Sequence, residues 1–219
     1  MSLQTSVPRQ DPSGRSASVV HVRRELTATV VLLVGFTAAV LLRVAVGGPM
    51  VARSEVAGLV FAAALVGLSA AGRTSVRPTS PANRRGTGVA AALGWGVLGA
   101  VVLCVPAVVA HLHGSAVLVP RALSDFPSWA AVVLLVAGAE ELFLRGVLFR
   151  RLVGYGVVCA VVVPAIAFAL LHLPLYGWGA LPLDLAVGVW LGALRVAAGS
   201  WGAPAVAHVL ADYAGWWLV

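Results

Sequence analysis

The sequence has no lysine, only two cysteines and only eight acidic residues among 219. Charged residues make up 11% of the chain and hydrophobic residues 60%, and the mean hydropathy is +0.98. These values exclude a water-soluble domain of this length and predict a polytopic membrane protein. Cys104 and Cys159 both fall within apolar runs. That placement argues against a disulfide framework and indicates small buried hydrophobic residues.

Because lysine is absent, all fifteen basic residues are arginine, and the formal net charge is +7. A charge of this sign can indicate nucleic-acid binding, but these arginines stand mostly at the ends of apolar runs, where arginine orients membrane helices. We therefore expect the membrane, and no nucleic acid, as a partner. The lack of lysine together with abundant Ala, Val, Gly and Arg favours a bacterial source, and hence the plasma membrane.

Apolar runs of about 20 residues, the length of a membrane-spanning helix, recur along the chain. They predict an all-α bundle of about seven transmembrane helices. Their approximate positions are 26–47, 55–72, 88–111, 128–149, 153–176, 179–198 and 200–219. We find no internal repeat among them.

The segments between these runs divide the chain. Residues 1–24, rich in Ser, Pro, Gln and Arg, are expected to form a disordered cytoplasmic tail. A two-helix N-terminal section (25–72) is followed by a cytoplasmic linker (73–87) and a five-helix section (88–219). Arginine is enriched in the tail, in the linker and after the fourth run, which predicts the N-terminus inside and the C-terminus outside.

Three ionisable residues, Glu140, Glu141 and Arg145, interrupt the fourth predicted span. A charged side chain near the bilayer centre costs about 2.5–3.5 kcal/mol on insertion scales, so such residues point to a function. Glu141 and Arg145 are four residues apart and can pair on one helix face. Glu140 points about 100° away from Glu141. Its carboxylate therefore needs another helix, water or a proton.

Two later spans carry polar residues at the same spacing. Phe168 and His172 lie on the fifth, and His208 and Asp212 lie on the seventh. Imidazole and carboxylate groups brought together from several helices can deprotonate water, stabilise an oxyanion or bind a transition metal. We therefore expect these helices to enclose one site within residues 128–219, in or near the inner half of the bilayer.

The three motifs resemble those of the CPBP intramembrane proteases, a family that includes type II CAAX prenyl endopeptidases and bacteriocin self-immunity proteins. Its members carry Glu-Glu-x-x-x-Arg on one membrane helix, Phe-x-x-x-His on the next and His-x-x-x-Asn or His-x-x-x-Asp on a later one. The matching residues here are Glu140, Glu141, Arg145, Phe168, His172, His208 and Asp212. Asp212 departs from the prenyl endopeptidase branch, which generally has Asn there.

The resemblance implies an intramembrane endopeptidase that hydrolyses a peptide bond of a membrane-associated or membrane-anchored protein or peptide. By resemblance, Glu140 acts with His172 to activate water. His208 and Asp212 would hold the tetrahedral oxyanion or its leaving group. Arg145 would orient the second glutamate of the pair and so complete the polar cluster.

The sequence permits both a metalloprotease and metal-free chemistry. Glu140, His172 and His208 could supply the three ligands of an open site for a divalent metal such as zinc. The His-Glu-x-x-His helix that makes a zinc prediction strong does not occur. Metal-free chemistry is therefore favoured, and the resemblance identifies no other cofactor.

Other classes of protein share some of these features. Intramembrane carboxylates also serve proton-coupled transporters, although these commonly show an internal repeat with paired broken helices. A catalytically silent immunity or scaffold protein is the second alternative. Arg145 is expected both to pair within the site and to snorkel toward the membrane surface. Arg43 and Arg195 stand near span ends and are interpreted as snorkelling residues outside the site.

Overall fold

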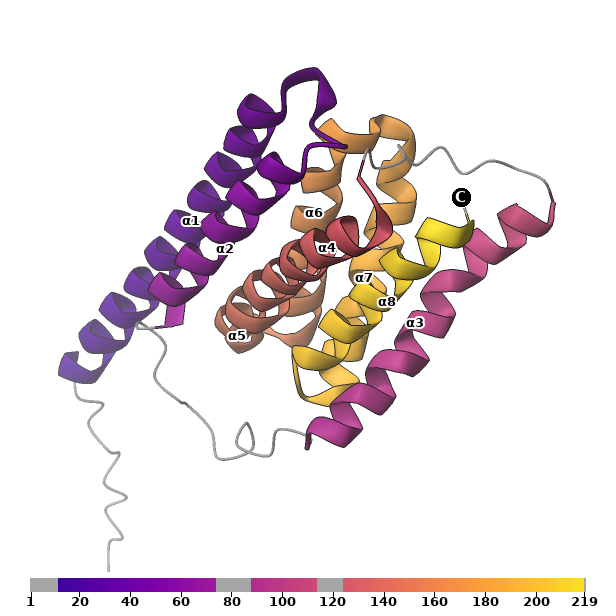
Figure 1. Ribbon diagram of the computed structural model, residues 1–219. Helices are drawn as coiled ribbons and strands as arrows, with labels where there is room; N and C mark the ends of the chain where they lie inside the picture. Colours follow the sequence, from indigo (N-terminus) through magenta and orange to yellow (C-terminus); the bar gives the residue numbers. More distant parts are fainter. Residues whose placement is uncertain (1–11, 74–87, 114–123, 219) are drawn as a thin grey trace, which may run out of the picture.

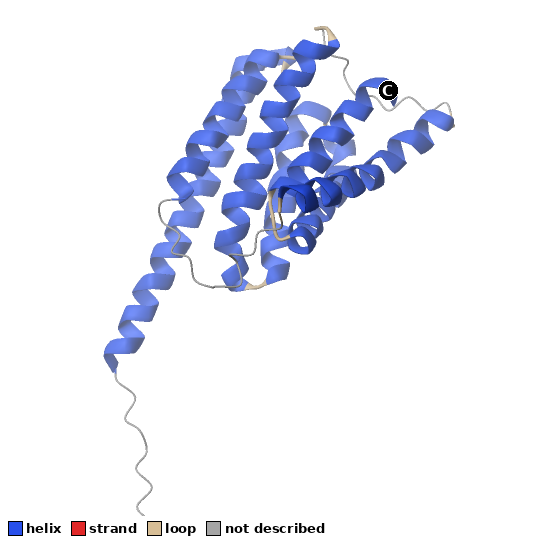
Figure 2. Cartoon of the chain, turned by 60° about the horizontal axis from the view of Figure 1, so that its bottom comes forward, coloured by secondary structure: helices blue, strands red, loops and turns tan. Residues whose placement is uncertain are grey.

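A computed structural model describes residues 12–73, 88–113 and 124–218. These residues form helices and turns, and no strand occurs among them (Figures 1 and 2). The predicted all-α fold is confirmed. Five helices in the described ranges are long and apolar enough to cross a membrane. They are Arg23–Met50, Glu55–Arg73, Val89–Leu112, Val157–Tyr176 and Trp178–Ala198.

Helices α1 (Pro12–Gly47) and α2 (Glu55–Arg73) form an antiparallel pair at one side of the bundle (Figure 1). A short 3-10 helix, η1 (Gly48–Met50), reverses the chain between them. Helix α1 begins inside the segment expected to be a disordered tail. Residues 15–24 contain no proline or glycine that would interrupt a helix, and proline is favoured in a first turn. Most of the predicted linker lies outside the described residues.

Helix α3 (Val89–Leu112) packs along the C-terminal helix α8 (Gly202–Leu218) at the opposite side (Figure 1). Glycine permits their close approach. A Cβ atom at Gly96 would lie 3.0 Å from the backbone oxygen of Ala203 and still closer to a valine of α8. Helix α3 therefore braces α8, which carries the last of the three motifs.

The middle of the bundle is one continuous helical segment made of α4 (Phe126–Glu141), the π-helix η3 (Leu142–Leu148) and α5 (Phe149–Leu152). Asp125 starts it as an N-cap, because its Oδ1 accepts the Ser128 N–H at 3.0 Å. Hydrogen bonding from Ser128 holds the pKa of the Asp125 carboxyl below its usual value. The α4–η3–α5 segment and α8 correspond to the predicted spans 128–149 and 200–219. These two spans are not among the five long apolar helices given above.

A short 3-10 helix, η4 (Val153–Tyr155), leads into α6 (Val157–Tyr176), and η5 (Trp178–Ala180) leads into α7 (Leu181–Ala198). Helices α6 and α7 pack against each other. A Cβ atom at Gly188 would lie 2.9 Å from the Cα atom of Ala165 and 3.0 Å from its backbone oxygen. Only glycine fits at this contact, which brings the backbone of α7 beside the second motif helix.

Large apolar side chains cover the outside of the bundle. Val34 and Leu41 of α1 are each 63% exposed, and Val101 of α3 is 60% exposed. Contiguous exposed apolar surface of this kind is unfavourable in water and favourable against lipid tails. Together with the five apolar helices, it identifies a multi-pass membrane protein.

Candidate functional site

The first motif forms the ion pair that its spacing predicts. Arg145 Nη1 donates to Glu141 Oε1 at 2.7 Å, and both residues are 0% exposed. Arg145 Nη2 donates to the backbone oxygen of Gly188, in α7, at 3.0 Å. Arg145 therefore does not snorkel to the membrane surface, because both of its terminal nitrogens have partners inside the bundle. The π-helix begins directly after Glu141, and such segments are frequent at functional sites.

Arg195 also lies inside the bundle, which corrects its interpretation as a snorkelling residue. Its Nε donates to the backbone oxygen of Arg145 at 3.1 Å, and its guanidinium carbon lies 4.8 Å from the centre of the Phe149 ring. A carbonyl oxygen and an aromatic face are both good partners for a guanidinium in an apolar environment. Arg195 thus holds the backbone that carries Arg145.

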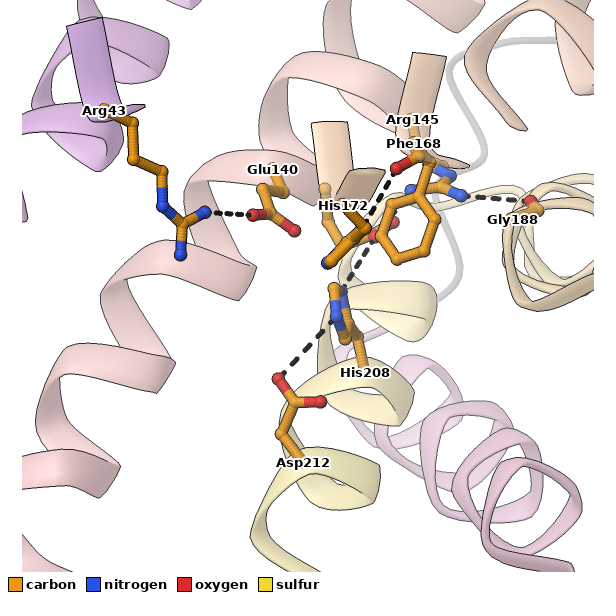
Figure 3. Close-up of polar contacts among 9 residues, drawn as sticks. Arg43, Glu140, Arg145, Phe168, His172, Gly188, His208 and Asp212 are labelled. Carbon is orange, nitrogen blue, oxygen red and sulfur yellow. Dashed lines mark hydrogen bonds and ion pairs between the residues drawn. The ribbon is translucent and has the colours of Figure 1, made fainter. Parts of the chain in front are cut away.

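Glu140 points away from Glu141, as predicted, and meets an arginine of another helix. Its Oε1 lies 3.8 Å from Nη1 of Arg43 in α1 (Figure 3), and the residue is 2% exposed. The snorkelling interpretation of Arg43 is therefore wrong as well. This contact is not predicted by the three motifs. The signal for it in the sequence is that the Glu140 face of its own helix carries no cation, so another helix must supply one.

His172 is fixed by the backbone of its own helix. Its Nδ1 lies 2.9 Å from the backbone oxygen of Phe168, which can only accept a hydrogen bond, so Nδ1 carries the proton. In the neutral imidazole, Nε2 is then an acceptor that is free to take a proton. Tyr176 stacks on this ring at 5.6 Å and was missed by the sequence analysis, although it continues the same four-residue spacing.

The Phe168 ring lies among the three motifs. It is 2% exposed, and its centre lies 4.5 Å from that of the His172 ring and 5.3 Å from that of the His208 ring. The guanidinium carbon of Arg145 lies 5.0 Å from the same ring centre. Phe168 therefore sets the distances between α6, η3 and α8 by packing, as an aromatic residue usually does.

His208 joins the third motif to the first. Its Nδ1 lies 3.2 Å from Glu141 Oε1, the same oxygen that accepts from Arg145, and its Nε2 lies 3.7 Å from Asp212 Oδ2 (Figure 3). Glu141 Oε2 is buried without a hydrogen-bond partner among the described residues. The Asp212 side chain is 40% exposed, so the cluster opens to its surroundings on this side.

The helix boundaries explain how Glu140 and His172 reach the same depth. Glu140 lies twelve residues before the end of α5 (152 − 140 = 12), and His172 lies fifteen residues after the start of α6 (172 − 157 = 15). At 1.5 Å per residue these distances are about 18 and about 22 Å from the turn between the two helices. The predicted boundaries, which ended the fourth span at residue 149, would have placed the two residues at different depths.

The candidate metal ligands are not arranged around a common point. No group of three or more His, Cys, Asp or Glu side chains in residues 12–73, 88–113 and 124–218 is placed to hold a metal ion. The two ring nitrogens of His208 face Glu141 and Asp212, whereas Glu140 pairs with Arg43. The donor set in this arrangement therefore does not fit a three-ligand zinc site.

Fold and site together define a multi-pass helical membrane protein in which three helices share a buried Glu–Arg–His cluster. Residues 122–214 match the family described as type II CAAX prenyl endopeptidase, Rce1-like. This match confirms the resemblance drawn from the three motifs: the segment is similar to the Rce1-like type II CAAX prenyl endopeptidases. Searches of curated proteins and of solved structures found no significant match to the chain.

The matched segment begins just before α4 and ends within α8. It holds every site residue predicted from the sequence. It does not include α1, α2 or α3, and so it does not include Arg43.

Proposed function

We propose that this protein is an intramembrane endopeptidase that hydrolyses a peptide bond of a membrane-associated or membrane-anchored protein or peptide. The observation that carries the proposal is the convergence of the first, second and third motifs around Phe168 and Glu141. The Rce1-like match supports the same reaction class. Two buried carboxylates, the buried His208 and the half-buried His172 form a cluster that opens at Asp212 and suits general acid–base chemistry.

In the proposed reaction, Glu140 and His172 activate the attacking water. His172 offers Nε2 as an acceptor because Nδ1 is committed to the backbone of α6. One of the two groups takes a proton as the water oxygen bonds to the carbonyl carbon, and the proton passes to the leaving nitrogen as the C–N bond breaks. All of these steps use protein side chains alone.

His208 and Asp212 are proposed to face the oxyanion of the tetrahedral intermediate or the leaving group. His208 is held from the other side by Glu141, whose Oε1 lies 3.2 Å from its Nδ1. Arg145 holds Glu141 in turn. Preorganised donors of this kind stabilise developing charge because they need no reorganisation during the reaction.

The name of the matched family suggests a substrate class that can be tested. A C-terminal Cys-aliphatic-aliphatic-X sequence is a signal for prenylation of the cysteine, and the lipid holds the peptide at the membrane. We propose a farnesylated peptide of this sequence as the assay probe, with a fluorophore and a quencher at its two ends. Cleavage between them raises the fluorescence.

We predict that Glu140→Gln and His172→Ala each abolish cleavage of this probe by the full-length chain in lipid nanodiscs. General acid–base catalysis alone contributes about 10² to 10⁴ in rate, so the losses should exceed those of a packing defect. Glu55→Gln and the exposed His113→Ala, which lie outside the site, serve as matched controls and should leave the rate unchanged.

Near-normal turnover by both site variants would refute the assignment, and so would a wild-type chain that does not cleave the probe. Substrates in cells can be sought by comparing new peptide termini in membranes that contain the wild-type chain or Glu140→Gln. A silent scaffold predicts identical termini in the two samples.

A further inference from the structure

We propose that the α1–α2 pair, which lies outside the Rce1-like segment, completes the active site by positioning Glu140 through Arg43. This inference rests on the proposed endopeptidase function. It adds a positioning residue and an element that the three motifs do not contain. It also gives the two-helix N-terminal section a role beyond membrane anchoring.

Glu140 has no other cation available to it within its own segment. Arg145 is already bonded to Glu141 and to the backbone oxygen of Gly188. The ion pair that Glu140 makes among the described residues is with Arg43, at 3.8 Å. An isolated carboxylate buried this deeply is unfavourable, so a fixed positive charge beside it has a direct effect on its placement.

The guanidinium of Arg43 lies over an aromatic ring. Its guanidinium carbon lies 5.0 Å from the centre of the Phe61 ring of α2, and its side chain is 11% exposed. Phe61 itself is 0% exposed. A guanidinium that lies over an aromatic face in a water-poor environment is well oriented. The cation therefore has a defined position between Phe61 and Glu140.

The same aromatic residue docks the helix pair against the Rce1-like segment. Phe36 of α1 contacts Phe61 edge-on, with ring centres 6.5 Å apart, and stacks on Phe143 at 5.4 Å with an interplanar angle of 2°. Phe143 follows Glu140 by three residues in the chain. All three rings belong to the buried core. This cluster fixes the position of Arg43 relative to Glu140.

The geometry leaves Arg43 able to guide Glu140 without neutralising it in a tight bidentate pair. The 3.8 Å separation exceeds hydrogen-bond distance, and the buried Arg43 Nε has no hydrogen-bond partner among the described residues. Glu140 thus keeps its oxygens available for water while its side chain is held toward α1. A displacement of about 1 Å in a reacting group can cost about 10² in rate.

The test compares Arg43→Gln, Arg43→Lys and Phe61→Leu with the wild-type chain, using the farnesylated peptide probe in nanodiscs. We expect Arg43→Gln to lower kcat by about 10² with KM little changed, because the proposed role of Arg43 is exerted through Glu140 and not on the substrate. Arg43→Lys keeps the charge and should recover most of the loss. Phe61→Leu should lower kcat by about threefold to tenfold, because leucine has no aromatic face to orient the Arg43 guanidinium.

Arg53→Gln is the matched control, because Arg53 is exposed in the turn between α1 and α2. It should leave kcat and KM unchanged. Thermal unfolding of each purified variant separates a rate effect from a loss of fold. If Arg43→Gln does not insert, Arg43→Lys and Phe61→Leu decide between the alternatives.

A kcat for Arg43→Gln within about twofold of the wild-type value would overturn the inference. A Lys variant as inactive as the Gln variant, with an equal loss of thermal stability, would also overturn it and assign Arg43 a structural role. Full activity in Glu140→Gln, or no cleavage by the wild-type chain, would instead count against the endopeptidase function itself.

Discussion

At the scale of single residues, the adjacent glutamates have different surroundings because they leave the helix in different directions. Glu141 is enclosed by Arg145 and His208, which both contact its Oε1. Glu140 faces α1 and forms an ion pair with Arg43 at the longer distance of 3.8 Å. The more tightly bound carboxylate suits a supporting role, and the less tightly bound one suits contact with water.

Asp212 is the residue at which this chain departs from the prenyl endopeptidase pattern. An amide donates a hydrogen bond at every pH, whereas a carboxyl donates only when it is protonated. We therefore expect Asp212→Asn to keep most of the activity, and Asp212→Ala, which has no donor, to lose about 10² in rate. The measurement is the rate of cleavage of the same probe.

Asp212 is half-buried, so thermal unfolding of both variants is measured beside their rates. If Asn proves as damaging as Ala, Asp212 acts as an ionised base or a ligand, and the proposed donor role is wrong. If Ala is as active as the wild-type chain, Asp212 takes no part in the reaction.

At the scale of helices, the close contact between α6 and α7 fixes the position of Gly188, the second hydrogen-bond partner of Arg145. Gly188 presents its backbone oxygen to Arg145 and lies against the backbone of Ala165. A methyl group at residue 188 would meet that backbone at 2.9 Å, and a backbone cannot move aside as a flexible side chain can. The position of Arg145 therefore depends on a glycine in another helix.

We predict that Gly188→Ala lowers both the unfolding temperature and the rate of probe cleavage, because separation of α6 and α7 lengthens the bond to Arg145. Overpacking of a closely packed core costs about 1–3 kcal/mol. Gly138→Ala in α4 is the matched control, since nothing lies within 4 Å of its added Cβ atom. Equal behaviour of the two variants in thermal unfolding would contradict this account.

At the scale of the whole molecule, the chain runs back and forth so that α1 starts at one end of the bundle and the C-terminus lies at the other (Figure 1). Near the first end, Arg151 Nη1 donates to Glu25 Oε2 at 3.1 Å. Arg43 lies eighteen residues further along α1 than Glu25 (43 − 25 = 18), or about 27 Å. Arg43 therefore lies toward the end of the bundle opposite the start of α1.

Glu140 lies near the middle of its own helical segment, fourteen residues after the start of α4 (140 − 126 = 14) and twelve before the end of α5. The depth of the site, expected from the sequence in or near the inner half of the bilayer, stays a prediction. The same holds for the orientation with the N-terminus inside, which the arginine distribution favours.

We predict that single cysteines introduced in the 73–87 loop are protected from an impermeant thiol reagent in intact cells, and that a cysteine at the C-terminus is labelled. Cys104 and Cys159 would first be replaced, because they are free thiols. Labelling of the loop from outside would contradict the orientation inferred from the arginines.

Local geometry was sufficient to determine much of this protein from its sequence. Hydropathy predicts an all-α membrane bundle, and a helix of 3.6 residues per turn predicts that residues four apart pair, as Glu141 with Arg145 and Phe168 with His172 do. The same geometry predicts that Glu140 must find a partner on another helix.

Only the tertiary structure decided which partner that is. Arg43 and Glu140 are about a hundred residues apart in the chain (140 − 43 = 97), and so are the Phe36 and Phe143 rings that bring them together (143 − 36 = 107). Likewise, Arg195 and Gly188 reach Arg145 because small residues let α6 and α7 approach closely. Such contacts depend on how helices pack, and hydrophobic periodicity indicates which face of a helix is apolar without indicating which helix will lie against it.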